Sequence, residues 1–133
     1  MINLGSLVSA RQSPMVSPYA TSKAALARLS DAMAKELDDR SSAVRVFTVS
    51  PGLVRTDMTR DLPQFQDLPE EAWTPVEEVG DLVVRAVNGE FDALSGRFLH
   101  VLFDLDTMVD EAETIVDDGL YILRLPGLED LVE

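Results

Sequence analysis

Two short apolar segments separated by a long helical segment constrain the fold of this 133-residue chain more than any other feature. Residues 1–7 end in an apolar stretch and residues 43–49 are rich in β-branched side chains, which predicts a strand in each. Between them, apolar residues recur at helical spacing from position 18 to about 38, with Ser17 as the expected N-cap and Pro18 as the first helical residue. Two strands joined by a helix predict a parallel pair with the helix packed on it.

The second half of the chain continues this alternation. Residues 60–73 are polar and punctuated by proline, which predicts a loop with short helical pieces. Thr74 and Glu77 have the spacing of a capping box around Pro75, which predicts a helix over residues 75–87. The predicted fold class is α/β, with about three parallel strands and helices packed on them. The remaining elements expected are a strand over 96–102, an acidic helix over 105–116 and a segment of uncertain type over 121–125.

Composition removes several classes of function. The absence of cysteine excludes disulfides, thiolate catalysis and cysteine-ligated metal centres, and a single histidine, His100, excludes a site built from several histidines. No apolar run approaches the ~18 residues that a membrane helix needs, which excludes a transmembrane protein. The first residues lack the pattern of a signal peptide, so we expect a cytoplasmic protein.

The net charge of −13 is unevenly distributed along the chain. Residues 1–60 carry eight Lys or Arg and five Asp or Glu, whereas residues 61–133 carry three and nineteen. Because an acidic surface repels phosphate, this balance argues against a nucleic-acid partner. The first sixty residues are the region that could attract an anionic ligand, and the chemistry is expected there.

Tyr19 and Lys23 are four residues apart near the start of the predicted long helix, so they share one face about a turn apart. A phenol is a poor base at neutral pH, but a neighbouring ammonium stabilises the phenolate and makes proton exchange with an alcohol or a carbonyl feasible. Ser6 follows the first strand, and ligands of open parallel sheets gather at the carboxyl ends of the strands. Taken alone, a tyrosine four residues before a lysine is more often a simple surface pair.

Three motifs in sequence order resemble the short-chain dehydrogenase/reductase family. They are Asn3-Leu4-Gly5-Ser6, Tyr19-Ala20-Thr21-Ser22-Lys23-Ala24-Ala25-Leu26 and Val49-Ser50-Pro51-Gly52-Leu53-Val54-Arg55-Thr56. The spacing matches as well, because Ser6 precedes Tyr19 by thirteen residues and Pro51 follows it by about thirty. The resemblance covers residues 1–102.

The resemblance implies an oxidoreductase that uses NAD or NADP to interconvert an alcohol and a carbonyl in a small molecule. Ser6 would hydrogen-bond the substrate oxygen, and Tyr19 would be the general acid/base. Lys23 would stabilise the tyrosine phenolate and hydrogen-bond the nicotinamide ribose, so Tyr19 and Lys23 are also expected at the cofactor. The residues expected to line the nicotinamide are Pro51, Gly52, Val54 and Thr56, and no metal site is implied.

The sequence departs from the family pattern at its amino-terminal side. It contains no glycine-rich strand–turn–helix for the cofactor pyrophosphate, so it resembles the carboxyl-terminal half of a Rossmann-like doubly wound sheet. We therefore expect one partial domain, family-like over 1–102 with an acidic helical extension and tail over 103–133, that does not bind a dinucleotide tightly alone. The alternative is a non-catalytic remnant or interaction module of the same family.

The family's quaternary structure gives one more expectation. The helix that bears the tyrosine commonly packs against its copy in another subunit, and residues 20–33 here carry more small apolar side chains than one contact with a sheet would use. A homodimer or homotetramer through the Tyr19–Lys23 helix is therefore expected.

Other polar and aromatic residues have simpler explanations. His100 could be imagined in a hydrolase triad, but a structural strand histidine is favoured because no nucleophile elbow surrounds Ser6. The acidic residues of 104–111 lack the pattern of a calcium loop and are expected on a solvated helix face. Trp73 could either line a substrate lid or anchor its loop. The sequence gives no functional role to Gly5 or Arg11.

Overall fold

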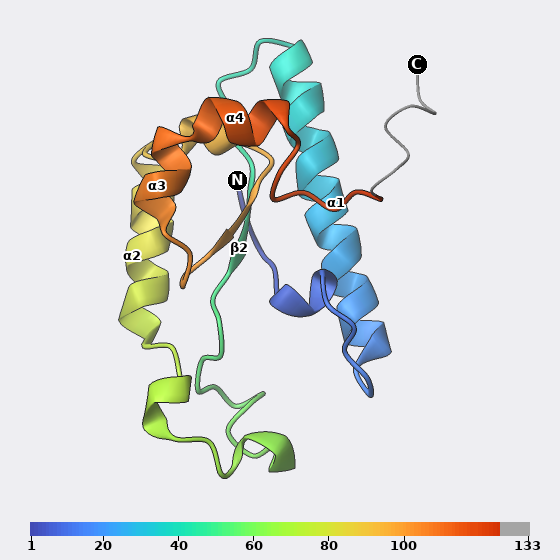
Figure 1. The fold of residues 1–133 in the computed structure, drawn as a ribbon, viewed down its shortest axis with the longest axis vertical. Coiled ribbons are helices and arrows are strands. Elements are labelled where there is room, and N and C mark those ends of the chain that lie inside the picture. Colours follow the sequence, from blue (N-terminus) through green and yellow to red (C-terminus); the bar gives the residue numbers. More distant parts are fainter. Residues whose placement is uncertain (126–133) are drawn as a thin grey trace.

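In the computed structural model, which describes residues 1–125, three parallel strands stand between helices (Figure 1). The α/β class with three parallel strands is thus confirmed. The strands are β1 (Ile2–Leu4), β2 (Phe47–Ser50) and β3 (Phe98–His100), and the helices are α1 (Ser17–Asp39), α2 (Val76–Val87), α3 (Leu105–Asp110) and α4 (Ala112–Asp117). Short 3-10 helices occupy η1 (Leu7–Ser9), η2 (Pro63–Phe65), η3 (Glu70–Ala72) and η4 (Asp92–Leu94).

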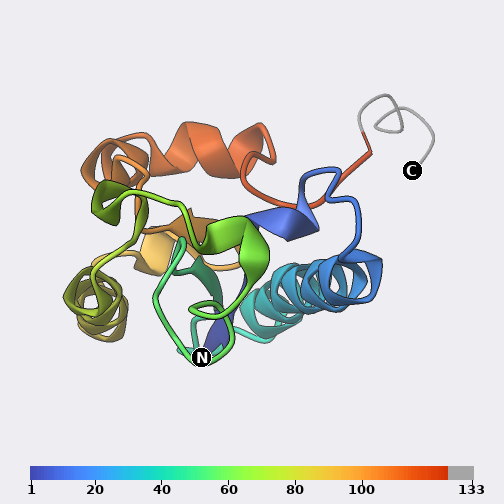
Figure 2. The ribbon, with the colours of Figure 1, turned by 90° about the horizontal axis from the view of Figure 1, so that it is seen from below.

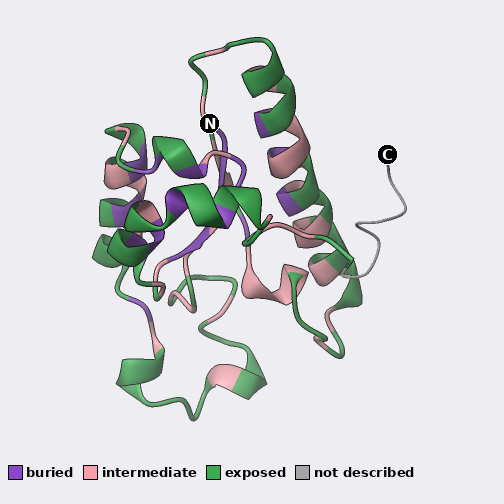
Figure 3. Ribbon diagram, turned by 45° about the horizontal axis from the view of Figure 1, so that its top comes forward, coloured by how far each residue is buried: buried purple, intermediate pink, exposed green. Residues whose placement is uncertain are grey.

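The central strand is β2, which pairs in parallel with β1 on one side and β3 on the other. All four of its residues are buried, as expected of a parallel strand covered on both faces (Figure 3). Leu4 lies opposite Val49, and Ser50 lies opposite His100. The carboxyl ends of the three strands therefore meet at one edge of the sheet, where Ser6 and Pro51 follow β1 and β2.

Different helices pack on the two faces of the sheet. Alternate side chains of a strand point to opposite faces, and Phe47, Val49 and Leu99 face a core built with α2, α3 and α4. Thr48 and Phe98 face α1 instead, because both line a small cavity of about 150 Å³ together with Ala27. Figure 2 shows α1 and α2 on opposite sides of the strands. The buried helical and 3-10 residues of the core are Leu82, Ala86, Leu94, Leu105, Met108, Ala112 and Ile115.

A polar link fixes α1 to β1. Asn3 donates a hydrogen bond from Nδ2 to Ser30 Oγ at 2.9 Å, and Ser30 Oγ donates to the carbonyl of Leu26 at 2.9 Å. Ser30 is fully buried on the face of α1 that also buries Ala27 and Ala34. The link therefore sets how far α1, and with it Tyr19, lies along β1.

Several predicted boundaries were wrong at the ends of elements. The strands are shorter than expected, because β1 gives way to η1 after Leu4 and pairing of β2 begins only opposite Ile2. The acidic helix predicted over 105–116 is two helices, since the backbone leaves helical geometry at Glu111 with φ −100° and ψ 14°. The break turns the chain so that α3 and α4 bury Met108 and Ile115 in one core.

The two predicted helix caps were also wrong. Ser17 lies inside α1, and Val16 holds the cap position without a side-chain hydrogen bond. Thr74 does not cap α2, because the buried Thr74 instead packs against the loop after β2 and donates its N–H to the carbonyl of Leu53 at 2.8 Å.

The segment 121–125 passes beside β3, where the carbonyl of Tyr121 accepts the Phe98 N–H at 2.8 Å. Residues 126–133, the end of the predicted tail, lie outside the described residues. Within residues 1–125, no helix combines the length and apolar character that crossing a membrane requires.

We expect Ser30→Ala to lower the free energy of unfolding by about 1–3 kcal/mol, because it leaves the Asn3 amide without an acceptor. Ser22 is the matched control, since its hydroxyl donates to the Tyr19 carbonyl in the same way on the exposed side of α1. Both substitutions gain the same helix propensity, so their difference in urea denaturation isolates the link. Equal stability of the two variants would contradict this assignment.

Candidate active site

The first turns of α1 bring Tyr19 and Lys23 together. The Lys23 ammonium lies over the Tyr19 ring, 5.6 Å from its centroid, and donates to the carbonyl of Leu4 at 2.7 Å. Tyr19 is 40% exposed, so part of the residue is accessible to a ligand. Helical spacing brings Lys23 to the Tyr19 ring, and the position of α1 along β1 brings it to the Leu4 carbonyl. The cation is therefore held at the carboxyl end of β1, two residues before Ser6.

The backbone of Leu4 faces away from β2. Met1 and Gly5 bond to Phe47 and Val49 of β2, and the backbone groups of alternate strand residues point to opposite sides. The Leu4 carbonyl is consequently on the outer side of β1 within residues 1–125, and Lys23 is its hydrogen-bond donor there.

Ser6 is half-buried at the junction of β1 and η1. Its Oγ accepts the N–H of Val8 at 3.4 Å, a long hydrogen bond that leaves its own O–H free to donate. The structure explains why glycine occupies the neighbouring position 5, which the sequence alone did not. A Cβ at Gly5 would lie 2.4 Å from Thr48 Cγ2, so a side chain at this position would clash with the Thr48 methyl group.

The loop after β2 carries the other predicted residues. Gly52 adopts φ +74°, where a side chain is strained, and a Cβ there would also lie 2.3 Å from Thr74 Oγ1. Thr59 ties the loop together, because its Oγ1 donates to the Val54 carbonyl at 2.6 Å and accepts the Thr56 N–H at 2.9 Å. Within residues 1–125, Val54 and Thr56 hydrogen-bond inside this loop and not to Ser6, Tyr19 or Lys23.

Trp73 packs within the same loop. Its ring lies 6.1 Å from that of Phe65 and 4.8 Å from the Arg55 guanidinium, which also pairs with Glu70 at 2.8 Å. Of the two roles considered for Trp73, these contacts favour the anchor. They hold the two ends of the loop 53–74 together beside the carboxyl ends of the strands.

His100 is a buried residue of β3, as the sequence favoured. Its Nδ1 accepts the N–H of Leu102 at 3.0 Å, and no hydrogen bond links it to Ser6. Burial lowers the pKa of His100 below its usual range, and the nearby Arg11 guanidinium lowers the pKa further. His100 is consequently neutral at neutral pH and structural.

The acidic residues of 104–111 have a local role at Asp104. This side chain caps α3 by accepting the N–H and the O–H of Thr107 at 3.1 and 2.9 Å, and these hydrogen bonds hold the pKa of Asp104 below its usual value. Across the part of the chain that the structure describes, no three His, Asp or Glu side chains are grouped to hold a metal ion.

The fold is an open parallel α/β sheet with Ser6, Tyr19 and Lys23 near the carboxyl ends of its strands, where such sheets bind their ligands. The family model described as short chain dehydrogenase matches residues 1–67. The chain belongs to the short-chain dehydrogenase family, as the sequence motifs indicated.

Curated relatives agree with this family. The chain is similar to the 3-oxoacyl-[acyl-carrier-protein] reductase FabG of Pseudomonas aeruginosa, 42% identical over 66 residues, which are 50% of this chain and 26% of that protein. FabG of Vibrio cholerae is 33% identical over 107 residues, 76% of this chain and 43% of that protein. The short chain dehydrogenase andI of Emericella variicolor is 31% identical over 122 residues, which are 88% of this chain and 39% of that protein. The chain thus spans less than half the length of these relatives.

The lowered pKa of His100 makes a prediction about stability and pH. Below about pH 6.5 the unfolded chain takes up a proton on this imidazole before the folded chain does, so acid favours unfolding. His100→Asn removes the titration while its amide oxygen can still accept the Leu102 N–H. Urea denaturation at pH 7.5 and pH 5.0 should show a larger loss of stability for the wild type than for the variant. An equal loss in both proteins would show that His100 does not contribute.

Proposed function

We propose that this chain carries the substrate half of the active site of an NAD(P)-dependent oxidoreductase, which interconverts an alcohol and a carbonyl by hydride transfer. The observation that carries the proposal is the Lys23 ammonium, held between the Leu4 carbonyl and the Tyr19 ring at the sheet edge where Ser6 lies. Membership of the family supports it, as do relatives whose names describe reductases of an oxo group.

The three residues have different roles in this mechanism. Ser6 donates its O–H to the carbonyl oxygen of the substrate and holds it beside Tyr19. Tyr19 gives its phenolic proton to that oxygen during reduction and removes a proton from the alcohol during oxidation. Lys23 stabilises the phenolate that forms, because its ammonium is fixed over the same ring. Positioning by Ser6 makes the proton transfer effectively intramolecular.

The donors of the described residues fit one end of a nicotinamide dinucleotide. Lys23 uses one ammonium donor on Leu4 and has two more for the hydroxyls of the nicotinamide ribose. Pro51, Gly52, Val54 and Thr56 form the turn that would border the nicotinamide. When bound, NADH or NADPH supplies the hydride. Residues 1–125 contain no glycine-rich turn from a strand into a helix, so we propose that the pyrophosphate is held by groups outside them.

The alternative is a non-catalytic remnant or interaction module that keeps the motifs. The reading frame upstream of the Met1 codon distinguishes the two. A glycine-rich strand–turn–helix in that frame supports the enzyme, and a protein that starts at Met1 and oxidises neither NADH nor NADPH with any carbonyl supports the alternative.

We expect Tyr19→Phe to lower turnover by about 10²–10⁴-fold, because it removes the group that exchanges the substrate proton. The measurement is oxidation of NADH or NADPH with a carbonyl substrate, in the protein that includes any in-frame upstream segment. Tyr121→Phe is the matched control, since Tyr121 is equally exposed at 40% and lies outside the candidate site. Near-normal turnover of a folded Tyr19→Phe protein would refute the proposed role.

We also propose that the chain self-associates through the outer face of α1. The inner face buries Ala27, Ser30 and Ala34 against the sheet, whereas Leu29 on the outer side is 51% exposed. An exposed apolar helix face beside the candidate site supports contact with the same helix of a second copy.

Leu29→Glu should therefore shift the protein toward monomer in light scattering at tens of micromolar. Val84→Glu is the control, because Val84 is similarly exposed, at 56%, on α2. A monomeric wild type, or equal effects of the two substitutions, would count against association through α1.

A further inference from the structure

Arg11 is a cation that the proposed mechanism does not use. It lies five residues after Ser6, in the segment that joins η1 to α1, and its side chain is exposed. Within residues 1–125 it makes neither an ion pair nor a side-chain hydrogen bond, whereas most other arginines of the chain have such partners. Its five N–H donors are therefore open to a ligand.

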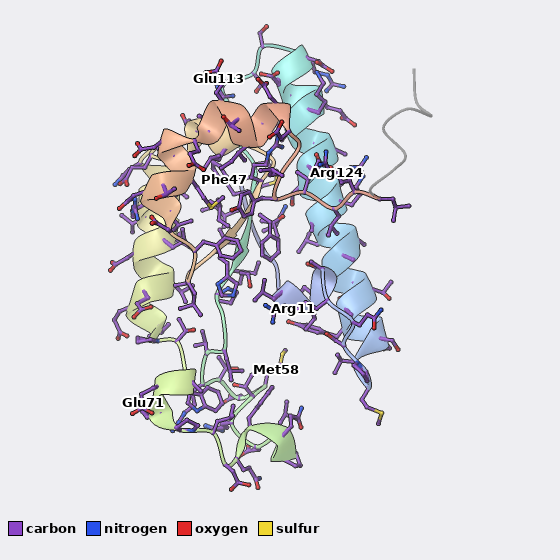
Figure 4. All side chains as sticks on the ribbon, in the orientation of Figure 1. Arg11, Phe47, Met58, Glu71, Glu113 and Arg124 are labelled. Carbon is purple, nitrogen blue, oxygen red and sulfur yellow. The ribbon has the colours of Figure 1, made fainter. Side chains whose placement is uncertain are left out.

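Arg11 reaches across the carboxyl edge of the sheet. The residue before it, Ala10, lines one cavity together with Phe98 of β3 and Phe103, which follows β3, and β2 lies between β1 and β3. The Arg11 charge also lowers the pKa of His100 at the end of β3. In Figure 4, Arg11 lies between η1 and the ends of the strands. The guanidinium is thus near the end of β2, where Pro51 and Gly52 begin the loop of the candidate site.

Arg11 is also on the same side of the sheet as Tyr19. His100 lies two residues after Phe98 and so shares its face, and Phe98 faces α1. Tyr19 and Lys23 extend from α1. Arg11 and the proposed proton donor therefore lie on the same face of the sheet, near the carboxyl ends of its strands.

An unpaired arginine in this place has a chemical meaning. The chain carries a net charge of −13, which disfavours the approach of anions in general. A guanidinium presents two parallel N–H donors that match a carboxylate or a phosphate. A local cation beside the reacting groups would select a substrate that bears such a group and would turn the rest of that substrate toward Tyr19.

We propose that Arg11 is a specificity-determining residue that binds the anionic group of the substrate, which is a carbonyl compound with a carboxylate or a phosphate a few bonds from the oxo group. This inference rests on the proposed function, because it names the substrate class of the same site. It adds Arg11 to Ser6 and Tyr19 as a residue that contacts the substrate.

His100 provides a readout that does not depend on turnover. It is the only histidine of the sequence, so its imidazole signals in NMR are unambiguous. A bound anion neutralises the Arg11 charge and should raise the pKa of His100. The probes are levulinate, which has a ketone and a carboxylate, and methyl levulinate, which keeps the ketone and lacks the charge. Both are titrated against the 133-residue chain and three variants: Arg11→Gln, Arg11→Lys and Arg40→Gln.

In the wild type, levulinate should raise the pKa of His100 and methyl levulinate should leave it unchanged. Arg11→Gln should raise that pKa without ligand, abolish the response and weaken levulinate binding about tenfold or more. Arg11→Lys should restore part of both effects, and Arg40→Gln, at the exposed end of α1, should match the wild type. Equal responses to the two probes, or a full response in Arg11→Gln, would overturn the inference.

Two further arms separate this inference from its alternatives. Nicotinamide mononucleotide carries the phosphate nearest the nicotinamide, and an Arg11-dependent response to it alone would assign Arg11 to the cofactor and overturn the substrate role. Turnover is measured independently. If levulinate binding requires Arg11 while no carbonyl is reduced with NADH or NADPH, the proposed function fails and the anion site stands. If levulinate and its ester are reduced and Arg11→Gln leaves both KM values unchanged, the proposed function stands and the anion site at Arg11 fails.

Discussion

The parallel hydrogen bonding of β2 to both of its neighbours determines where the candidate site residues that follow the strands lie. Because Leu4 pairs with Val49 and Ser50 with His100, the three strands end together, and each residue that follows a strand emerges at the same edge. Next to this pairing, Gly5 leaves room for the Thr48 methyl group, which a Cβ at that position would approach to 2.4 Å. The chemistry at the edge thus depends on a packing contact inside the sheet.

The second requirement is the position of α1 along β1. Tyr19 and Lys23 are neighbours in any helix, but Lys23 reaches the end of β1 because α1 is held against the sheet by the Asn3–Ser30 link and by the buried Ala27 and Ala34. The loop after β2 is fixed separately, by the contact of Gly52 with Thr74 and by the Arg55 side chain against Trp73. Two independent attachments therefore bring α1 and this loop to one edge of the sheet.

Much of this arrangement is predictable from the sequence. The β-branched run before Ser50 and the helical periodicity after Pro18 report burial directly, and the motif spacing identified the family. The break at Glu111 was not predictable, because the apolar spacing of Leu105, Met108, Ala112 and Ile115 continues through it. Thr74 fits a capping box in sequence, but its burial against Gly52 depends on a tertiary contact. The reach of Arg11 to His100 likewise depends on how an irregular segment folds across the sheet, which no periodicity records.

The hydrogen bond from Lys23 to the Leu4 carbonyl gives the Lys23 side chain a second function, unrelated to Tyr19. Among residues 1–125, β1 is an outer strand of the sheet, and its outward-facing Leu4 carbonyl is an acceptor that another strand can use when the ammonium does not cover it. Deleting the lysine side chain would uncover that acceptor as well as removing the charge beside Tyr19. Loss of activity in such a variant would therefore have two explanations, aggregation and failed proton transfer. Aggregation, measured as particle size, and turnover must be followed in the same sample before a chemical role is assigned to Lys23.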